Sequence, residues 1–317
     1  MIVINAFQPL KGNDLSIDKT IAIAILARDC EKYLPKNIQK IENLRKHFRD
    51  SLVVVIENDS IDRTKNILKE WERNSGNIVV ISEDYHAITI PEKTEERPLP
   101  GASRYRMDKM CFYRNKYMEY LRSIDAKFDY LMIIDIDIDD FSEQGIINAI
   151  INAPPDWTAL FANGIKYMKF FTRIRMGYYD GYPLILLNEN DGNIIIDRTF
   201  KELMENVYKL MKETKKNKYI KCISAFGGIG IYKYQYIKDA NYFTIPNNQS
   251  SIIEVLCDHV SINYALFQKK VGTSYIVSEM VVYYKQIKNI KLFLLEILPL
   301  NLTIFLYEFF KRKKYPV

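Results

Sequence analysis

Four short apolar segments, separated by stretches of helical pattern, constrain most strongly what this chain can fold into. They are Thr20–Arg28, Leu52–Asn58, Asn77–Ser82 and Phe128–Asp135. Continuous apolar runs of this length are typical of strands that are buried on both faces of a sheet. Between them, apolar side chains recur at helical spacing in residues 34–48, in a helix for which Ser60 is the expected N-cap, and in residues 104–122.

The order of these elements predicts an α/β fold with a mostly parallel central sheet that is flanked by helices. A polar loop of about twenty residues, Asp84–Ser103, interrupts the alternation, and loops of this length are usually functional or mobile. In the less regular second half, the pattern predicts a strand at 157–163, helices at 197–215 and 258–270, and two β segments that meet at Gly227 and Gly228. No linker divides the chain into independent domains.

Composition limits the class of protein. Of the 317 residues, 48% are hydrophobic and 26% are charged, which is typical of a folded protein. A net charge of +6 is too small to indicate nucleic-acid binding by itself. The four cysteines form no Cys-x-x-Cys pair, which argues against a zinc or redox site, and the first residues lack a signal-peptide pattern. We therefore expect a cytoplasmic protein with reduced thiols and no nucleic-acid partner.

The segment YLMIIDIDIDDF places acidic residues directly after the fourth predicted strand. They are Asp135, Asp137, Asp139 and Asp140. Alternate residues of an extended chain point to the same side, and two carboxylates about 4 Å apart repel by roughly 4 kcal/mol. A hard divalent cation, Mn²⁺ or Mg²⁺, would relieve this repulsion, and we expect Asp135 and Asp137 to hold it. The alternative is an acidic turn before the next helix, which suits Asp140.

Other motifs are less specific. The acidic segment does not match an EF-hand loop, because Asp140 stands where glycine is needed and Ile146 where the last glutamate is needed. The segment FGGIG lacks the G-x-G-x-x-G pattern of a dinucleotide site, and its glycines would equally suit a tight turn. Arg106 and Arg114 share one predicted helix, where guanidinium groups suit phosphate, and a solvated basic face is the alternative.

These segments together resemble glycosyltransferases of the GT-A fold, which place a D-x-D motif at the end of a central strand. VVVIENDSIDRTKNIL is similar to their second strand and turn, and ILARDCEKYLPKNIQKI is similar to their first strand and loop. RYRMDKMCFYRNKYMEYL, SAFGGIGIYK and CDHVSINYAL most resemble the capsule-type α-1,3-mannosyltransferases of glycosyltransferase family 69 and their bacterial relatives. The resemblance covers residues 20–267 and implies a GT-A-like domain.

The resemblance also implies a role for each matching residue. For the donor, it implies that Arg28 lies against the nucleotide, that Glu57, Asn58 and Asp59 lie at the base and ribose, and that Arg106, Arg114 and Asn115 face the diphosphate or donor sugar. It implies that Asp135 meets metal and ribose, that Asp137 meets the metal, that Gly227 and Gly228 lie near the acceptor, and that Asp258 and His259 lie at the reacting carbon or the metal. Glu57 stands where those enzymes usually have aspartate.

The implied activity is metal-dependent transfer of a sugar from a GDP- or UDP-sugar to a hydroxyl of a glycan or lipid-linked acceptor, in surface polysaccharide synthesis. An inverting enzyme needs a base, for which Asp258 is the candidate, although its position also suits a helix N-cap. The likeness to family 69 favours retention instead. Two other classes stay open: a nucleotidyltransferase, which the glycine-free segment ARDCEKYLP disfavours, and a non-catalytic nucleotide-sugar-binding protein.

The resemblance divides the chain into a glycosyltransferase domain, residues 1–288, and a tail, residues 289–317. The donor half of the domain spans about 20–140 and the acceptor half about 141–288. The tail contains the apolar run Leu292–Phe310 followed by KRKK, with polar residues near its middle that argue against a simple membrane span. We expect residues 292–314 to form an interfacial helix on the cytoplasmic face of a membrane; docking on the protein or on a second copy is the alternative.

Overall fold

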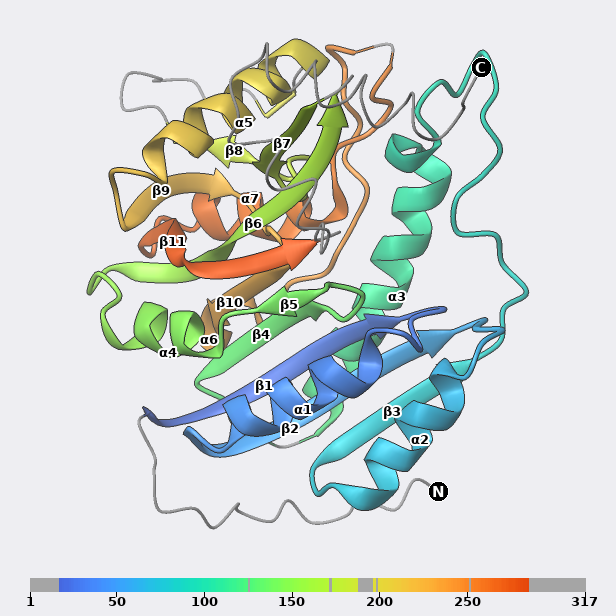
Figure 1. The fold of residues 1–317 in the computed structure, drawn as a ribbon, viewed down its shortest axis with the longest axis vertical. Helices are drawn as coiled ribbons and strands as arrows, with labels where there is room; N and C mark the ends of the chain where they lie inside the picture. Colours follow the sequence, from blue (N-terminus) through green and yellow to red (C-terminus); the bar gives the residue numbers. More distant parts are fainter. Residues whose placement is uncertain are drawn as a thin grey trace, which may run out of the picture.

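The computed structural model describes residues 17–124, 126–170, 173–187, 196–197, 199–250 and 252–284. Within them, the strands form one sheet in the order β3-β2-β1-β4-β10-β6-β11-β9-β8, with β5 paired to β11 and β7 paired to β6 (Figure 1). The predicted helical tail at 289–317 lies outside these residues. No helix within them is long and apolar enough to cross a membrane.

The first half of the chain has the predicted alternation of strands and helices. Its elements are β1 (Ile17–Ala27), α1 (Leu34–Arg45), β2 (Phe48–Asn58), α2 (Thr64–Asn74), β3 (Ile78–Glu83), the short 3-10 helix η1 (Pro100–Ala102), α3 (Arg104–Ser123) and β4 (Tyr130–Asp135). Strand β1 lies between β2 and β4, β3 lies outside β2, and all four are parallel. The carboxyl ends of β1, β2 and β4 therefore meet at one edge of the sheet.

Helices cover both faces of this parallel part, as the sequence predicts. Ile23 and Ile25 of β1 share a core with apolar side chains of α1 and α2. Ala22 and Ala24, which point to the opposite face, share a second core with α3. In Figure 1, α1 and α2 lie in front of β1–β3, and α3 lies behind them. The continuous apolar runs in the sequence thus correspond to strands buried on both faces.

The second half of the chain forms the mixed part of the sheet. Its elements are β5 (Asp140–Phe141), α4 (Glu143–Ile151), β6 (Trp157–Phe170), β7 (Arg173–Tyr178), β8 (Ile185–Leu186), α5 (Phe200–Glu213), β9 (Tyr219–Ser224), β10 (Ile229–Lys233), α6 (Tyr234–Ile237), α7 (Asp258–Gln268) and β11 (Thr273–Tyr284). Strand β10 is antiparallel to both β4 and β6, whereas β11 is parallel to β6. The predicted α/β fold is confirmed, with its parallel strands concentrated in the first half.

Two helix starts differ from the sequence prediction. Helix α2 begins at Thr64, and the hydroxyl of Ser60 instead accepts a hydrogen bond from the backbone N–H of Asp29, at 3.1 Å. Helix α7 has Cys257 as its N-cap, so Asp258 is already its first helical residue. In both cases, the polar side chain that the local pattern assigned to an N-cap bonds instead to a residue that is distant in sequence. Strand β11, a central strand, was not predicted from the sequence.

Candidate functional site

A cavity of about 550 Å³ lies where the carboxyl ends of β1, β2 and β4 meet. Polar residues from several parts of the chain line it, namely Arg28, Asn58, Arg106, Arg114, Asp135, Asp137, Lys166 and Asp180. Tyr113, Tyr178, Tyr179, Tyr182 and Tyr284 add aromatic walls. Ligands of open α/β sheets bind beyond the carboxyl ends of the strands, so the cavity lies where this fold places a binding site.

The carboxylate of Asp135 ends β4 inside this cavity. Its Oδ2 atom accepts a hydrogen bond from the hydroxyl of Tyr179, at 2.9 Å. Burial and the nearby charge of Asp137 raise the pKa of Asp135 to about 7, although Arg114 and Tyr179 act in the opposite direction. The folded chain therefore holds a carboxylate in a place where its negative charge is poorly compensated.

The turn that carries Asp137 is held by a side chain of α1. Asn37 is fully buried, and its Nδ2 atom donates hydrogen bonds to the carbonyl oxygens of Ile136, at 2.9 Å, and Ile138, at 2.8 Å. Ile136 and Ile138 are buried, whereas Asp135 and Asp137 line the cavity. From Asp135 to Ile138, the chain thus alternates between cavity-lining aspartates and buried isoleucines.

Asp140 has a different environment from the two cavity aspartates. Its carboxylate forms ion pairs with Lys36, at 2.7 Å, and Lys40, at 2.6 Å, both on α1. Although burial alone would raise its pKa, the hydrogen bonds from these lysines lower the pKa below its ordinary value. Asp140 is the acidic turn residue that the sequence allowed, and the lysines compensate its charge.

Arg114 of α3 lines the cavity, and Asp258 supports it from behind. The Nε atom of Arg114 donates a hydrogen bond to Oδ2 of Asp258, and each side chain is only 5% exposed. The guanidinium also lies 5.7 Å from the ring centres of Phe226 and Tyr242. Burial would raise the pKa of Asp258, but Arg114 and then His259 hold it well below its usual range. Asp258 is not among the cavity-lining residues.

His259 is buried in an apolar setting. Its ring stacks on Phe226, with ring centres 3.8 Å apart, and neither ring nitrogen has a hydrogen-bond partner within the described part of the chain. Burial, followed by the charge of Arg114, lowers the pKa of His259 to about 3, so the ring is neutral at physiological pH. His259, predicted as a metal ligand or catalytic group, does not line the cavity.

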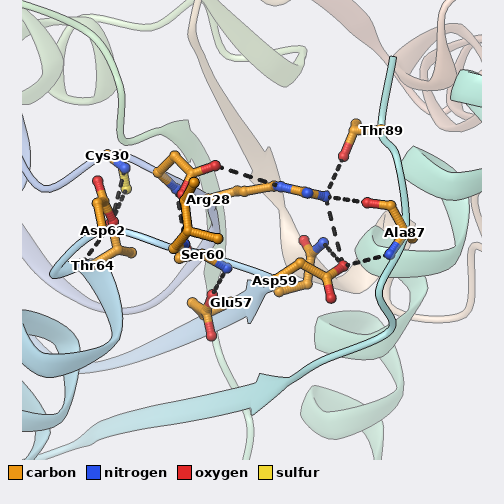
Figure 2. A network of polar contacts seen from close by, with 12 residues as sticks. Arg28, Cys30, Glu57, Asp59, Ser60, Asp62, Thr64, Ala87 and Thr89 are labelled. Carbon is orange, nitrogen blue, oxygen red and sulfur yellow. Dashed lines mark hydrogen bonds and ion pairs between the residues drawn. The ribbon is translucent and has the colours of Figure 1, made fainter. Parts of the chain in front are cut away.

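Arg28 and Asp59 connect the strand ends to the loop after β3 (Figure 2). The Nη1 atom of Arg28 donates to the carbonyl of Ala87, at 2.8 Å, and to the hydroxyl of Thr89, at 2.7 Å. The carboxylate of Asp59 lies 3.6 Å from the same nitrogen and accepts hydrogen bonds from the backbone of this loop. Burial would raise the pKa of Asp59, but Asn58, the loop amides and Arg28 lower it.

Glu57 is fully buried, and its carboxylate is hydrogen-bonded within the chain. It accepts hydrogen bonds from the N–H of Ser60, at 2.9 Å, and from the hydroxyl of Ser82. Next to it, the hydroxyl of Thr64 accepts a hydrogen bond from the N–H of Cys30, at 2.8 Å (Figure 2). The segment NDSIDRT therefore locks the turns after β1 and β2 together, and only Asn58 of the predicted base and ribose group lines the cavity.

Three further predicted residues position the walls of the site. Asn115 exchanges two hydrogen bonds with the backbone of Tyr242, at 2.9 and 2.7 Å. Gly227 and Gly228 have φ angles of +62° and +92°, and a Cβ at Gly227 would lie 2.3 Å from the carbonyl oxygen of Ala162. The two glycines therefore form the tight turn that the sequence allowed. The carbonyl of Gly228 accepts the N–H of Asp135, at 2.9 Å, and so fixes the end of β4.

The cavity residues fit a divalent cation that is coordinated both by protein carboxylates and by a phosphate. Asp135 and Asp137 supply oxygen ligands, and burial, followed by the charge of Asp137, raises the pKa of Asp135. No group of three or more His, Cys, Asp or Glu side chains in the described residues converges on one point. Mg²⁺-type sites commonly use one or two carboxylates together with substrate phosphates, so two are sufficient.

Sequence reasoning missed two functional candidates. Asp180 follows β7, lines the cavity, and has a pKa raised to about 8 by burial and then by Asp135 and Asp258. Asn37 holds the acidic turn from α1. The only local signal for Asp180 was the turn-forming pair Asp-Gly within YYDGY. A buried asparagine in a helix carries no signal of its partner 99 residues away.

Comparison with known proteins identifies a glycosyltransferase domain. The family model described as glycosyltransferase family 25, N-terminal domain, matches residues 18–281, so the chain belongs to this family. The predicted class is therefore confirmed, whereas the narrower likeness to family 69 is not confirmed. No curated protein matches the chain.

Several solved structures resemble the chain at low identity and with TM-scores below 0.5. A mannosyltransferase from Pyrobaculum calidifontis, in complex with GDP-Man and Mn²⁺, has a TM-score of 0.45 and 12% identity over 90% of this chain and 61% of that one. S. aureus TarS 1-349, in complex with UDP-GlcNAc, has a TM-score of 0.45 and 12% identity over 85% and 59%. Glucosyl-3-phosphoglycerate synthase from Mycobacterium tuberculosis has a TM-score of 0.39 and 11% identity over 89% and 74%. The chain thus spans about three fifths of the first two.

Proposed function

We propose that this chain is a metal-dependent glycosyltransferase that moves a sugar from a nucleotide-sugar donor to a hydroxyl group. The observation that carries the proposal is the cavity at the ends of β1, β2 and β4, in which Asp135 and Asp137 lie among Arg28, Arg106 and Arg114. Carboxylates suit a divalent cation, and guanidinium groups suit a diphosphate. A nucleotide sugar bound with a divalent cation presents both partners at once.

Each side of the cavity would have its own task. Asp135 and Asp137 would hold the cation, which when bound supplies positive charge to the departing nucleoside diphosphate. Arg106 and Arg114 would add fixed positive charge, because they enter the cavity from one helix, α3. The Nε atom of Arg106 is buried and has no partner among the described residues, so it is available to an anionic ligand.

Asp258, predicted as the base of an inverting enzyme, would act in this proposal through Arg114. Its buried ion pair keeps the guanidinium in place at the cavity wall, and its low pKa makes it a poor proton acceptor at neutral pH. Whether transfer retains or inverts the anomeric configuration then depends on groups of the donor and of the cavity other than Asp258.

The remaining predictions belong to the same proposal. The acceptor would be a glycan or lipid-linked glycan of surface polysaccharide synthesis, as the resemblance to family 69 implies. The protein would work in the cytoplasm or on the cytoplasmic face of a membrane, with residues 292–314 as the contact. The loop Asp84–Ser103, which is hydrogen-bonded to Arg28 and Asp59, would close over the donor.

A thermal-shift panel tests the proposal. Wild type and Asp137→Ala are each mixed with GDP-mannose, UDP-GlcNAc, GDP or UDP, with Mn²⁺, Mg²⁺ or EDTA. A ligand at 100 times its Kd adds about 2.7 kcal/mol to the free energy of unfolding, so a bound donor raises the melting temperature of the wild type. We expect a shift that requires the metal and is lost in Asp137→Ala. No shift with any donor or metal would contradict the proposal.

Adding nucleoside triphosphates to the panel, and measuring the release of nucleoside diphosphate from the donor, separates the competing classes. A nucleotidyltransferase would be stabilised by a nucleoside triphosphate more than by any nucleotide sugar. A non-catalytic binding protein would show the metal-dependent shift but release no nucleoside diphosphate during prolonged incubation with the donor. A glycosyltransferase releases it slowly by hydrolysis and faster when an acceptor is present.

A further inference from the structure

Asp180 is the one carboxylate in the lining of the cavity that has no role in the proposed function. It follows β7 in a turn, with a φ angle of +57°, a backbone conformation in which aspartate and asparagine are overrepresented. Its side chain lines the cavity and is partly buried. No hydrogen bond or ion pair joins its carboxylate to any described residue.

Hydrogen bonds from three tyrosines hold the turn that carries Asp180. Tyr178 donates its hydroxyl hydrogen to the carbonyl of Ala162, at 3.1 Å, and Tyr179 donates to Asp135, at 2.9 Å. On the other side, Tyr182 donates to the carbonyl of Val255. Three tyrosine hydroxyls thus anchor the segment, and the acidic side chain between them is left facing the cavity.

The carboxylate of Asp180 is partly exposed at the cavity and has no partner among the described residues, so a ligand that enters the cavity can reach it. Burial, followed by the charges of Asp135 and Asp258, raises the pKa of Asp180 to about 8, and Arg114 and Arg106 only partly oppose this. A carboxyl group offers a diphosphate no favourable charge. A third metal ligand is not supported, because no three acidic or histidine side chains converge within the described residues.

We propose that Asp180 binds the sugar of the donor by hydrogen-bonding its hydroxyl groups. The inference rests on the proposed function, since it assumes that a nucleotide sugar enters this cavity. A carboxyl group offers two oxygens to hydroxyl donors and, when protonated, a hydrogen to a hydroxyl oxygen. Among the charged groups, Asp135 acts most strongly on Asp180, and the sugar is attached directly to the diphosphate that we propose is held at Asp135 and Asp137.

The test compares ligands that differ only in the sugar. Isothermal titration with Mn²⁺ gives Kd values for GDP against GDP-mannose and for UDP against UDP-GlcNAc. For Asp180→Ala, we expect the Kd of the nucleoside diphosphate to stay within about twofold of wild type. The Kd of the nucleotide sugar should rise roughly 10- to 100-fold, the range for a hydrogen bond to a charged group. Asp180→Asn should lose less, because its amide still bonds hydroxyls.

A matched control separates this effect from general loss of a buried carboxylate. Asp50 is buried, burial raises its pKa as it does that of Asp180, and it lies near the start of β2, at the opposite end of that strand from the cavity. Asp50→Asn should leave both Kd values unchanged. Asp180→Asn keeps the positive φ angle tolerable and so serves as the folded variant if Asp180→Ala is unstable.

Two results would overturn the inference while the proposed function stands. One is an equal weakening of nucleoside diphosphate and nucleotide sugar in both Asp180 variants, which would indicate only altered charge in the cavity. The other is no change in either Kd. If the wild type binds none of the four ligands, the proposed function itself fails and this inference fails with it.

Discussion

Arg114 and Asp258 form a buried ion pair across 144 residues of sequence, with Nε of the arginine donating to Oδ2 of the aspartate. The pair joins α3 to the first turn of α7 and stands directly behind the cavity wall. Both residues were predicted as site residues separately. The structure shows that one presents its charge to the cavity while the other holds it in place.

Removing one partner of this pair should strongly destabilise the fold. Arg114→Met leaves the carboxylate of Asp258 buried without a counter-charge. Asp258→Asn leaves the guanidinium of Arg114 buried without a counter-charge. Breaking a buried pair in this way costs about 3–5 kcal/mol, whereas replacing both partners by apolar residues costs much less. Urea unfolding of the two single variants and of Arg114→Met/Asp258→Leu measures this. Single variants within 1 kcal/mol of wild type would contradict the account.

The same pair gives a defined dependence of stability on pH. The pKa of Asp258 is lower in the folded chain than the ordinary value of about 4, because Arg114 outweighs the effect of burial. Its contribution is therefore complete above about pH 4 and is lost as pH falls through the folded pKa. Below pH 4, the wild type should lose stability more steeply than the double variant. Parallel curves for the two proteins would show that Asp258 is not held ionised.

Asp135 should behave in the opposite way, because its pKa is raised to about 7 in the folded chain. The folded state then holds a proton that the unfolded state has released, so its contribution to stability is present below about pH 4 and is lost as pH rises through 7. In EDTA, Asp135→Asn should gain stability over wild type between pH 5 and pH 8. Chemical denaturation at both pH values measures the difference.

Asp140→Asn is the matched control in the same acidic segment. Lys36 and Lys40 lower the pKa of Asp140, so its contribution is present above about pH 4. Asp140→Asn should therefore be less stable than wild type at pH 8, the reverse of Asp135→Asn. If Asp135→Asn is also destabilised at pH 8 in EDTA, the idea of an uncompensated carboxylate at the end of β4 is wrong.

Asn37 should matter to both stability and metal binding. Asn37→Leu removes the donors to the carbonyls of Ile136 and Ile138, and each unsatisfied buried carbonyl costs about 1–3 kcal/mol. Because these carbonyls flank Asp137, we expect at least a tenfold weaker Kd for Mn²⁺ in the presence of nucleotide, measured by isothermal titration. Asn43→Leu, on the same helix, should change neither quantity. Unchanged Mn²⁺ affinity in a folded Asn37→Leu would contradict the role of this side chain.

The parts of the fold that the sequence predicts are those governed by local pattern. Strands β1 to β4 are buried on both faces, so their apolar runs are continuous, and the parallel order then follows from the helices between them. The acidic edge after β4 follows in the same way. Strand β11 was missed because the polar residues Ser278 and Glu279 interrupt its apolar run, at the point where its pairing with β6 shifts register.

The details of the site depend on long-range contacts that local pattern does not contain. Glu57, Asn115 and Asp258 are where their motifs place them. Their polar groups, however, are hydrogen-bonded within the chain, to Ser82, Tyr242 and Arg114 respectively. Asp180 was missed for the converse reason. Its short segment looks like a plain turn, and the sequence does not show that its carboxylate faces the cavity without a partner among the described residues.

The central claim, that the end of β4 holds a metal on the diphosphate of a nucleotide, is tested most directly by crystallography. Crystals of the wild type grown with Mn²⁺ and GDP or UDP are measured at a wavelength where manganese scatters anomalously. The account predicts one strong anomalous peak in contact with Asp137 and with a phosphate oxygen, and its loss in Asp137→Ala. A bound nucleotide without a manganese peak beside Asp137, or a peak at other residues, would contradict the claim.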